Sequence, residues 1–202
     1  MEIIDLTHTF SADMPVYPGD SKPEIKQVAT IAKQGWSDYE VKTGMHIGTH
    51  MDGPLHMTTK GQKISEINPE RFVGSGKIID ARGRDKITPD LITGVEAGDI
   101  VLVLTGFGSK FYDADYYEKY PELTEDFAQK LVQLQVKMVG TDTPTPDRPP
   151  FAVHKILLSQ EILILENLTN LEQLLNKKFE VMALPLKFDG DSALARVVAK
   201  ID

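Results

Sequence analysis

Eleven residues, from His46 to His56, constrain the fold more than any other part of the chain. They read His-Ile-Gly-Thr-His-Met-Asp-Gly-Pro-Leu-His and hold three of the five histidines in the sequence. Two glycines and a proline in so short a segment exclude a regular helix. The segment is therefore expected to be extended, or bent at one of its glycines.

Four side chains in this segment are candidate metal ligands, and all stand at even positions: His46, His50, Asp52 and His56. Alternate side chains of an extended chain point to the same face. A flat strand, however, would separate His46 from His50 by roughly 13 Å at the backbone. Bonds from imidazole to a metal are only about 2 Å long, so either the chain bends, with Gly48 as the hinge, or the site holds more than one ion. The competing interpretation is a surface loop with incidental histidines.

Composition limits the other possibilities. The length of 202 residues suits one domain, 1–202, and the 41% apolar and 26% charged content is ordinary for a globular protein. A net charge of −8 disfavours nucleic acid as a partner. The chain has no cysteine, so any metal must be held by histidine nitrogen and carboxylate oxygen, which suits zinc, manganese or iron(II).

The sequence carries no sign of a membrane partner. No apolar run approaches the roughly 20 residues of a membrane helix. The chain begins Met-Glu-Ile-Ile-Asp, without the basic and then apolar segment of a secretory signal. These features predict a cytoplasmic protein.

Hydrophobic patterns and turn residues predict alternating strands and helices. Strands are expected over 2–6, 24–31, 39–43, 77–80, 99–105, 137–140, 161–165, 180–186 and 193–201. Helices are expected from the Thr124 cap to 134 and over 151–160. A helix is also expected to start at Thr88-Pro89-Asp90, and a capping box of Thr169 and Glu172 predicts another helix that ends at 176. One or two helical turns are expected over 112–120. The fold class is α/β with a mixed sheet.

Two residues from the second half of the chain are candidates to complete a metal site. Glu166 follows an apolar strand, and the ends of strands are where sites form in mixed sheets. His154 lies in the preceding helix. The competing interpretations are a charge flanking a helix for Glu166 and an exposed helical position for His154. A proline-rich loop, 141–150, follows the predicted strand 137–140. This loop is either the lip of a site or a plain connector.

The histidine segment resembles the signature of the cyclase-type metal hydrolases, a family that includes bacterial kynurenine formamidase and isatin hydrolase. The matching pattern is His46-x-Gly-Thr-His50-x-Asp52-x-Pro-x-His56. Five other segments follow the order of this family: Pro15-Val-Tyr-Pro-Gly-Asp20, Gly140-Thr-Asp-Thr143, His154-Lys-Ile-Leu-Leu158, Glu166-Asn-Leu-Thr-Asn170 and Ala183-Leu-Pro-Leu186.

The resemblance implies a swivelling β/β/α single domain, assembled as a homodimer or homotetramer, with two divalent ions. Zinc is the first expectation for the metal and manganese the alternative. The resemblance assigns His46, His50 and Asp52 to one ion and His154 to the other, with Asp52 and Glu166 shared. His56 would be the proton donor and acceptor.

The implied reaction is hydrolysis of an amide in a small molecule, with N-formylkynurenine of tryptophan catabolism as the first candidate and kynurenine and formate as products. Tyr17, which stands between two prolines, and Phe107 are the predicted contacts to the aromatic ring. Tyr17 replaces a tryptophan usual in the formamidases, and the segment 190–196 lacks the glycine-serine-proline run of many members. Both departures concern the substrate pocket.

Two other functions stay open. The metals could instead serve hydrolysis of a cyclic amide such as isatin, a lactone or another small ester, or the chain could be a non-catalytic metal-binding module. A serine hydrolase is disfavoured, because the chain has no Gly-x-Ser-x-Gly motif around its serines.

Overall fold

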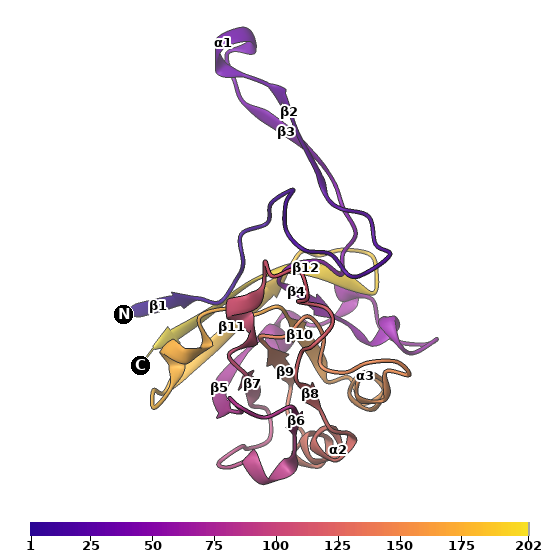
Figure 1. The fold of residues 1–202 in the computed structure, drawn as a ribbon, viewed down its shortest axis with the longest axis vertical. Coiled ribbons are helices and arrows are strands. Elements are labelled where there is room, and N and C mark those ends of the chain that lie inside the picture. The colour runs from indigo at the N-terminus through magenta and orange to yellow at the C-terminus, as the bar shows by residue number, and fades with distance from the viewer. Residues whose placement is uncertain (202) are drawn as a thin grey trace.

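The computed structural model describes residues 1–201, and its central feature is an eight-stranded mixed sheet (Figure 1). The strands follow the order β1-β12-β11-β5-β7-β9-β10-β4, and a further pairing of β12 with β4 closes the sheet into a barrel. Their bounds are β1 Glu2–Asp5, β4 His50–Asp52, β5 Val73–Asp80, β7 Ile100–Leu104, β9 Met138–Thr141, β10 Leu163–Glu166, β11 Phe179–Pro185 and β12 Ser192–Ile201. The predicted α/β class with a mixed sheet is confirmed.

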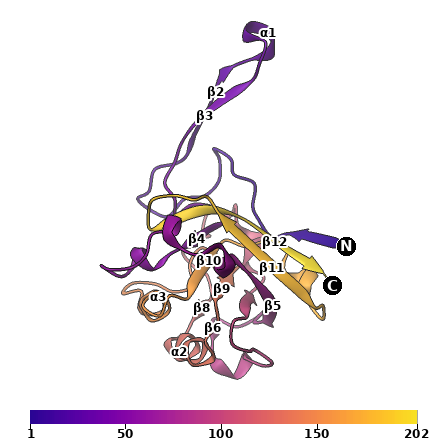
Figure 2. The same ribbon diagram turned by 180° about the vertical axis from the view of Figure 1, so that it is seen from behind.

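Closure depends on the length of β12. Its first residues, Ser192 to Leu194, pair with β4, while its later residues pair with β11 on one side and β1 on the other. Glu2 lies opposite Ile201 in this ladder, so the two ends of the chain lie side by side (Figures 1 and 2). Strand β12 therefore pairs with β1 at the start of the chain and with β4 of the histidine segment.

The middle of the sheet is parallel and fully buried. Strands β5, β7, β9 and β10 run parallel, and every residue of β7 is buried, as its apolar sequence predicts. Alternate residues of β7 face two cores. Val101 and Val103 pack with helices α2 (Glu125–Leu134) and α3 (Ala152–Leu158), whereas Ile100, Leu102 and Leu104 point into the barrel.

Helix α2 begins as the sequence predicts. Thr124 Oγ1 accepts a hydrogen bond from Phe127 N at 3.2 Å, and Glu125 and Asp126 occupy the first turn, where the helix dipole favours acidic groups. Its apolar stripe packs against α3, which confirms the second predicted helix. None of the helices described over residues 1–201 is long and apolar enough to span a membrane.

Strands β2 (Glu24–Ala29) and β3 (Asp38–Lys42) pair only with each other, joined through the short helix α1 (Ile31–Gln34). We call residues 24–42 the arm. It projects far from the barrel (Figures 1 and 2), and all five residues of β3 are exposed. The strands predicted here are confirmed, but they do not join the main sheet.

The helix starts predicted at Thr88 and Thr169 are each followed by a 3-10 helix instead of an α-helix, and neither threonine caps that helix with its side chain. Thr169 N donates to Leu6 O at 3.1 Å, so this residue pairs with the start of the chain instead of capping a helix. The single turn that follows is a 3-10 helix with Asn170, at φ 59°, before it. Thr88 makes no capping bond to a helix, and 112–120 is a series of turns whose tyrosines Tyr116 and Tyr120 are buried.

The remaining short elements are 3-10 helices and a two-stranded parallel pair, and the sequence predicted helix starts at only two of them, η4 and η6. They are η1 Pro54–His56, η2 Ile64–Glu66, η3 Pro69–Phe72, η4 Pro89–Leu91, η5 Phe107–Lys110 and η6 Leu171–Leu174, with strands β6 Lys86–Ile87 and β8 Glu122–Leu123.

Candidate metal centre

Strand β4 carries two of the predicted ligands on one face. His50 and Asp52 are two residues apart in the strand, so their side chains point the same way. The neighbouring strand β10 places Glu166 directly opposite His50, and side chains directly opposite in an antiparallel pair share a face. Two strands from distant parts of the sequence thus bring two carboxylates and an imidazole together.

A bend at Gly48 brings His46 toward His50. Gly48 has φ 55°, and its carbonyl accepts a hydrogen bond from His50 Nδ1 at 2.8 Å. The two imidazole rings lie 5.4 Å apart between centroids, far less than the separation of a flat strand. The chain thus bends at Gly48, one of the two alternatives that the spacing left open. The hydrogen bond to the Gly48 carbonyl leaves His50 Nε2 facing the carboxylates, 3.3 Å from Glu166 Oε2.

His154 reaches the same point from helix α3. Its Nε2 lies 3.3 Å from Glu166 Oε1 and 3.6 Å from Asp52 Oδ2. The residue is buried, which excludes an exposed helical position. Its other nitrogen, Nδ1, donates to Asp147 Oδ1 at 2.5 Å, and Asp147 Oδ2 accepts from Val153 N at the start of the helix.

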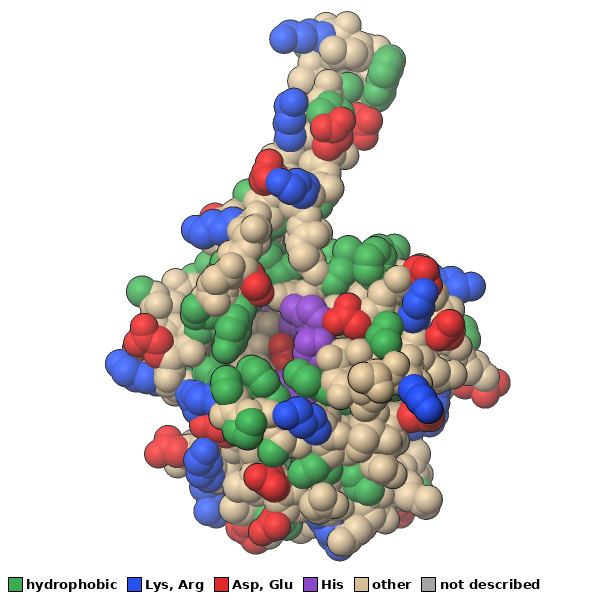
Figure 3. Space-filling view, turned by 90° about the vertical axis from the view of Figure 1, so that its right-hand side faces the viewer, with side chains coloured by type: hydrophobic (Ala, Val, Ile, Leu, Met, Phe, Trp, Pro, Cys, Tyr) green, Lys and Arg blue, Asp and Glu red, His purple; other side chains and the backbone are tan. Residues whose placement is uncertain are grey.

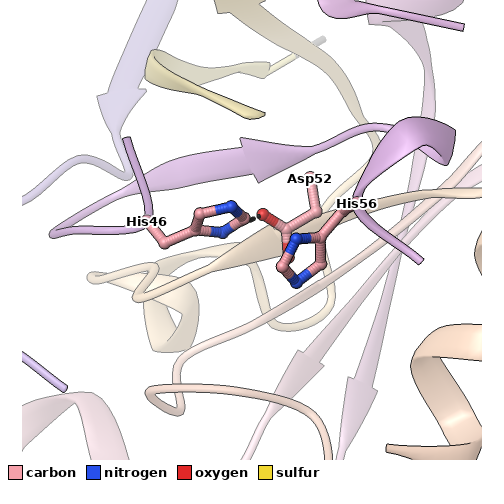
Figure 4. Close-up of side chains that lie close together, drawn as sticks. All are labelled: His46, Asp52 and His56. Carbon is pink, nitrogen blue, oxygen red and sulfur yellow. Dashed lines mark ion pairs between the residues drawn. The ribbon is translucent and has the colours of Figure 1, made fainter. Parts of the chain in front are cut away.

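His46 and His56 lie on either side of the Asp52 carboxylate (Figure 4), and both are partly exposed whereas Asp52 is buried. His46 Nδ1 lies 2.9 Å from Asp52 Oδ1, and the rings of His46 and His56 are 4.1 Å apart between centroids. One oxygen of Asp191 contacts both histidines, at 2.9 Å from His46 Nε2 and 3.1 Å from His56 Nδ1. The structure therefore brings together all six residues that were expected at the centre.

Atoms that could bind metal form two overlapping groups. One is His50, Asp52 and Glu166, and the other is His46, Asp52 and His56; within each group the ligand atoms lie within 4.8 Å of one another. Asp52 belongs to both. Asp52 could therefore contribute an oxygen to a cation held by either group.

Unsatisfied polar atoms at the centre fit a bound cation. His50 Nε2 and both carboxylate oxygens of Asp52 are buried, and no residue among 1–201 gives them a hydrogen bond of good geometry, in spite of the short distances around them. Burying a carboxylate without partners is costly. A divalent cation would supply the missing partner to all three atoms, and their nitrogen and oxygen chemistry suits zinc or manganese.

Close contacts between the histidines and the carboxylates shift the pKa values of three groups at the centre. Burial raises the pKa of Asp52, but the charge of His50 and the contacts with His154 and His46 outweigh it, so the net pKa lies well below the usual value. Burial lowers the pKa of His46, but Asp52 and Asp191 raise it to about 9. Burial also lowers the pKa of His154, but the contacts with Asp147, Asp52 and Glu166 outweigh it, so the net pKa lies well above its usual value. The raised pKa values of His46 and His154 thus favour protonated imidazoles beside the buried carboxylates.

A cavity of about 310 Å³ opens above the centre. In Figure 3 the histidines lie in a hollow beneath the arm, with apolar side chains around it. Tyr17, which was predicted to contact a substrate ring, lines this cavity, and its ring meets Tyr117 edge-on at 5.7 Å. Phe151 lines the cavity as well.

Phe107 does not reach the cavity. It is only 7% exposed and stacks on Tyr116 at 5.3 Å, inside an aromatic cluster. Because that stacking occupies its ring, Phe107 is not among the residues that line the cavity, and the expectation that it contacts a substrate ring is not supported.

Sequence reasoning missed Asp147 and Asp191. Asp147 lies in the proline-rich loop that was predicted to be either the lip of a site or a plain connector. Asp191 lies in the segment 190–196, which was noted only for its departure from the family pattern. Their contacts depend on how a loop folds back over α3 and how β12 pairs with β4, so spacing in the sequence gives no signal for either residue.

A family model described as "Putative cyclase" matches residues 4–148 of the chain. The chain belongs to the cyclase family. A 37% identical relative in this comparison is the uncharacterized protein MJ0783 of Methanocaldococcus jannaschii, matched over 98% of this chain and 99% of that protein. A kynurenine formamidase of Bacillus cereus is 27% identical, with 98% and 97% covered.

Solved structures extend the similarity of this cyclase-family chain. Isatin hydrolase A from Ralstonia solanacearum superposes with a TM-score of 0.88 at 25% identity, covering 98% of this chain and 91% of that one. The relatives with named activities are hydrolases, and the fold matches theirs throughout. The chain is therefore a cyclase-family protein related to kynurenine formamidase and isatin hydrolase.

Proposed function

We propose that this chain is a metal-dependent hydrolase of small amides, an arylformamidase that converts N-formylkynurenine to kynurenine and formate. One observation carries the proposal: buried, unpaired ligand atoms of His50 and Asp52 converge with Glu166 and His154 on the floor of a cavity with aromatic walls. Similarity to proteins named kynurenine formamidase supports the choice of substrate.

The proposed centre holds two divalent ions, zinc in the first place and manganese as the alternative. His46, His50 and Asp52 would hold one ion, and His154 the other, with Asp52 and Glu166 shared by both. A divalent ion in such a site lowers the pKa of a bound water toward about 7 and polarises a carbonyl group. Asp147 and the Gly48 carbonyl hold His154 and His50 with Nε2 toward the site, in the way that outer hydrogen bonds orient metal ligands.

His56 is the proposed proton-transfer group. Water adds to the formyl carbon, His56 takes a proton, and it returns the proton to the aniline nitrogen as the carbon–nitrogen bond breaks. The side chain is about a quarter exposed and lines the cavity, so its ring can reach a bound substrate. An imidazole can both accept and donate a proton near neutral pH, which suits it to this role.

The walls of the cavity suit an aryl substrate. Tyr17, Tyr117 and Phe151 line it, and aromatic rings pack well against one another edge-on or offset. The rings would orient the aryl group while the formamide faces the floor. The volume of about 310 Å³ lies at the lower end of the range for small-molecule sites, which favours a compact substrate.

A second candidate substrate is a cyclic amide such as isatin. The observation that favours it is the structural likeness to isatin hydrolase A. Ring opening of isatin cleaves the same type of bond, so the metal ligands and His56 would keep their roles. The remaining alternatives are a lactone or small ester and a metal-binding module without activity.

The test combines metal analysis with a substrate panel of N-formylkynurenine, isatin and a lactone. We expect near two metal ions per chain in the parent and preferential turnover of the formamide. Asp52→Ala is expected to lose both metal and turnover, whereas Asp90→Ala, which changes an exposed acid far from the site, keeps both. Turnover of isatin without turnover of the formamide would favour the second candidate substrate. Bound metal without turnover of any substrate would favour a metal-binding module without activity.

We also propose that the chain forms a homodimer through the arm, with a homotetramer as the alternative. Four large apolar side chains of the arm are more than half exposed: Ile31, Trp36, Tyr39 and Val41. An isolated two-stranded hairpin is marginally stable in water. The same chain also exposes Leu184 and Leu186 beside a groove of about 570 Å³. In a two-fold dimer each copy presents the same surfaces to the other. A second copy could therefore cover both apolar surfaces at once.

A further inference from the structure

Asp191 lies between the proposed proton-transfer histidine and a proposed metal ligand. Its Oδ2 is 3.1 Å from His56 Nδ1 and 2.9 Å from His46 Nε2. We infer that Asp191 is a positioning residue, which holds His56 in the tautomer and orientation needed for proton transfer and ties it to His46. The inference rests on the proposed function only for the role of His56 in proton transfer.

The chemistry of the acceptor fixes the tautomer. An ionised carboxylate accepts hydrogen bonds and donates none. His56 Nδ1 must therefore carry the hydrogen, which leaves Nε2 as the nitrogen with a free lone pair in the neutral ring. Residues 1–201 make no hydrogen bond to His56 Nε2, so that nitrogen is available to a substrate in the cavity that His56 lines.

The backbone around Asp191 is held on both sides. Asp191 O accepts a hydrogen bond from Gly53 N at 2.8 Å, and Gly190 O accepts from Ile64 N at 2.9 Å. A Cβ on Gly53 would lie 3.1 Å from Asp191 O, so this close approach suits glycine. Ser192, the next residue, is paired with Asp52 in the sheet. The Asp191 side chain therefore extends from a fixed point of the backbone beside β4, the strand that carries His50 and Asp52.

The shared oxygen couples His46 and His56. Their rings lie 4.1 Å apart, and each donates to the same atom of Asp191. A ligand that donates its second nitrogen to a carboxylate is held in one orientation and becomes a better donor to metal. Loss of Asp191 is therefore expected to weaken metal binding by about 10- to 100-fold and, separately, to slow proton transfer when metal is saturating.

The experiment compares Asp191→Ala and Asp191→Asn with Asp189→Ala as the matched control. Asp189 is an acid two residues away that pairs with Lys63 and touches neither histidine. Metal content, kcat and KM for an aryl formamide are measured at saturating Zn²⁺. Nitrogen NMR of the imidazoles is recorded on the Zn²⁺-loaded proteins, where five histidines give few signals and His56→Gln assigns those of His56.

For Asp191→Ala we expect kcat to fall by about 10- to 100-fold with KM changed less than about twofold, and the His56 signals to shift from the Nδ1–H form toward a mixture of tautomers. Asp191→Asn, whose amide oxygen still accepts, should recover most of the Nδ1–H signal and part of kcat. The control should match the parent.

Two results would overturn the inference. One is an unchanged His56 tautomer in Asp191→Ala. The other is full recovery of kcat by added Zn²⁺, because Asp191 would then act on His46 alone. The NMR measurement needs no turnover, so it decides the positioning role even if the parent hydrolyses no formamide and the proposed function fails.

Discussion

Asp147 Oδ1 accepts a hydrogen bond from His154 Nδ1 at 2.5 Å, and both side chains are buried. The same carboxylate also accepts from Val153 N at the start of α3. The loop thus sets both the direction of the imidazole and the start of its helix. His154 Nε2 is left facing Asp52 and Glu166.

Replacing Asp147 is expected to weaken metal binding without removing a ligand. In Asp147→Asn the amide oxygen can still accept from His154 but the charge is lost, so metal affinity should fall by about 10- to 100-fold. Competition with a chelator measures the affinity. Asp113→Asn, at an exposed position, is the control, and equal affinities in the two variants would contradict the role of Asp147.

Metal binding is expected to release protons. The pKa of His46 is raised to about 9 by Asp52 and Asp191 against the effect of burial, and that of His154 is raised as well. Because both pKa values are raised, we expect both imidazoles to carry a proton at pH 7.5 before metal is added, and a ligand must give up its proton. Calorimetry of Zn²⁺ binding in buffers of different ionisation enthalpy should show about two protons released, and one fewer for His46→Gln. Affinity should rise with pH up to about 9.

His56 is expected to matter for turnover and not for metal content. His56→Gln should keep the metal stoichiometry of the parent while kcat falls by about 10²–10⁴-fold, the usual contribution of a proton-transfer group. Because His56 also lies in a group of three ligand-type residues, metal analysis is decisive. Loss of an ion in this variant would make His56 a ligand and remove it from the proposed mechanism.

His8 should make the fold sensitive to acid. Its ring stacks on Phe111 at 3.9 Å, and burial lowers its pKa to about 4. Below pH 6.5 the unfolded chain takes up a proton that the folded chain refuses, so stability falls as pH drops from about 6.5 to 4. His8→Phe should remove roughly 1 kcal/mol of this loss, allowing for partial exposure. Urea unfolding between pH 6.5 and 4 measures the free energy of unfolding of the parent and of His8→Phe. Parallel pH profiles of the two proteins would contradict the role of His8.

The arm offers an intrinsic probe of assembly. Trp36 is the single tryptophan of the chain and is 60% exposed. If two copies pair through the arm, its emission should shift to the blue as concentration rises, while light scattering reports twice the chain mass of 22.5 kDa. Tyr39→Lys should abolish both effects. Tyr112→Lys, at an equally exposed aromatic away from the arm, should keep them, and a mass of four chains would favour the tetramer.

The local patterns that decide secondary structure were readable from the sequence. The apolar run 99–105 predicted the buried strand β7, and Thr124 with its acidic neighbours predicted the start of α2. Predictions failed where a long-range contact uses the same backbone group, as at Thr169, whose N–H donates to Leu6. A capping pattern cannot reveal that competition, because the competing partner lies in a distant part of the sequence.

For the candidate site, residue types and spacing were enough to predict the donor set: imidazoles and carboxylates without thiols, a glycine where the chain can bend, and an acid at the end of an apolar strand. The pairing of the strands was needed to show that Asp147 and Asp191 contact the histidines, that Phe107 packs away from the cavity, and that the arm does not join the main sheet. The difference lies in the range of the interactions. Residue type and spacing fix local conformation and chemistry, whereas the partners of a side chain depend on which strands pair when the barrel closes.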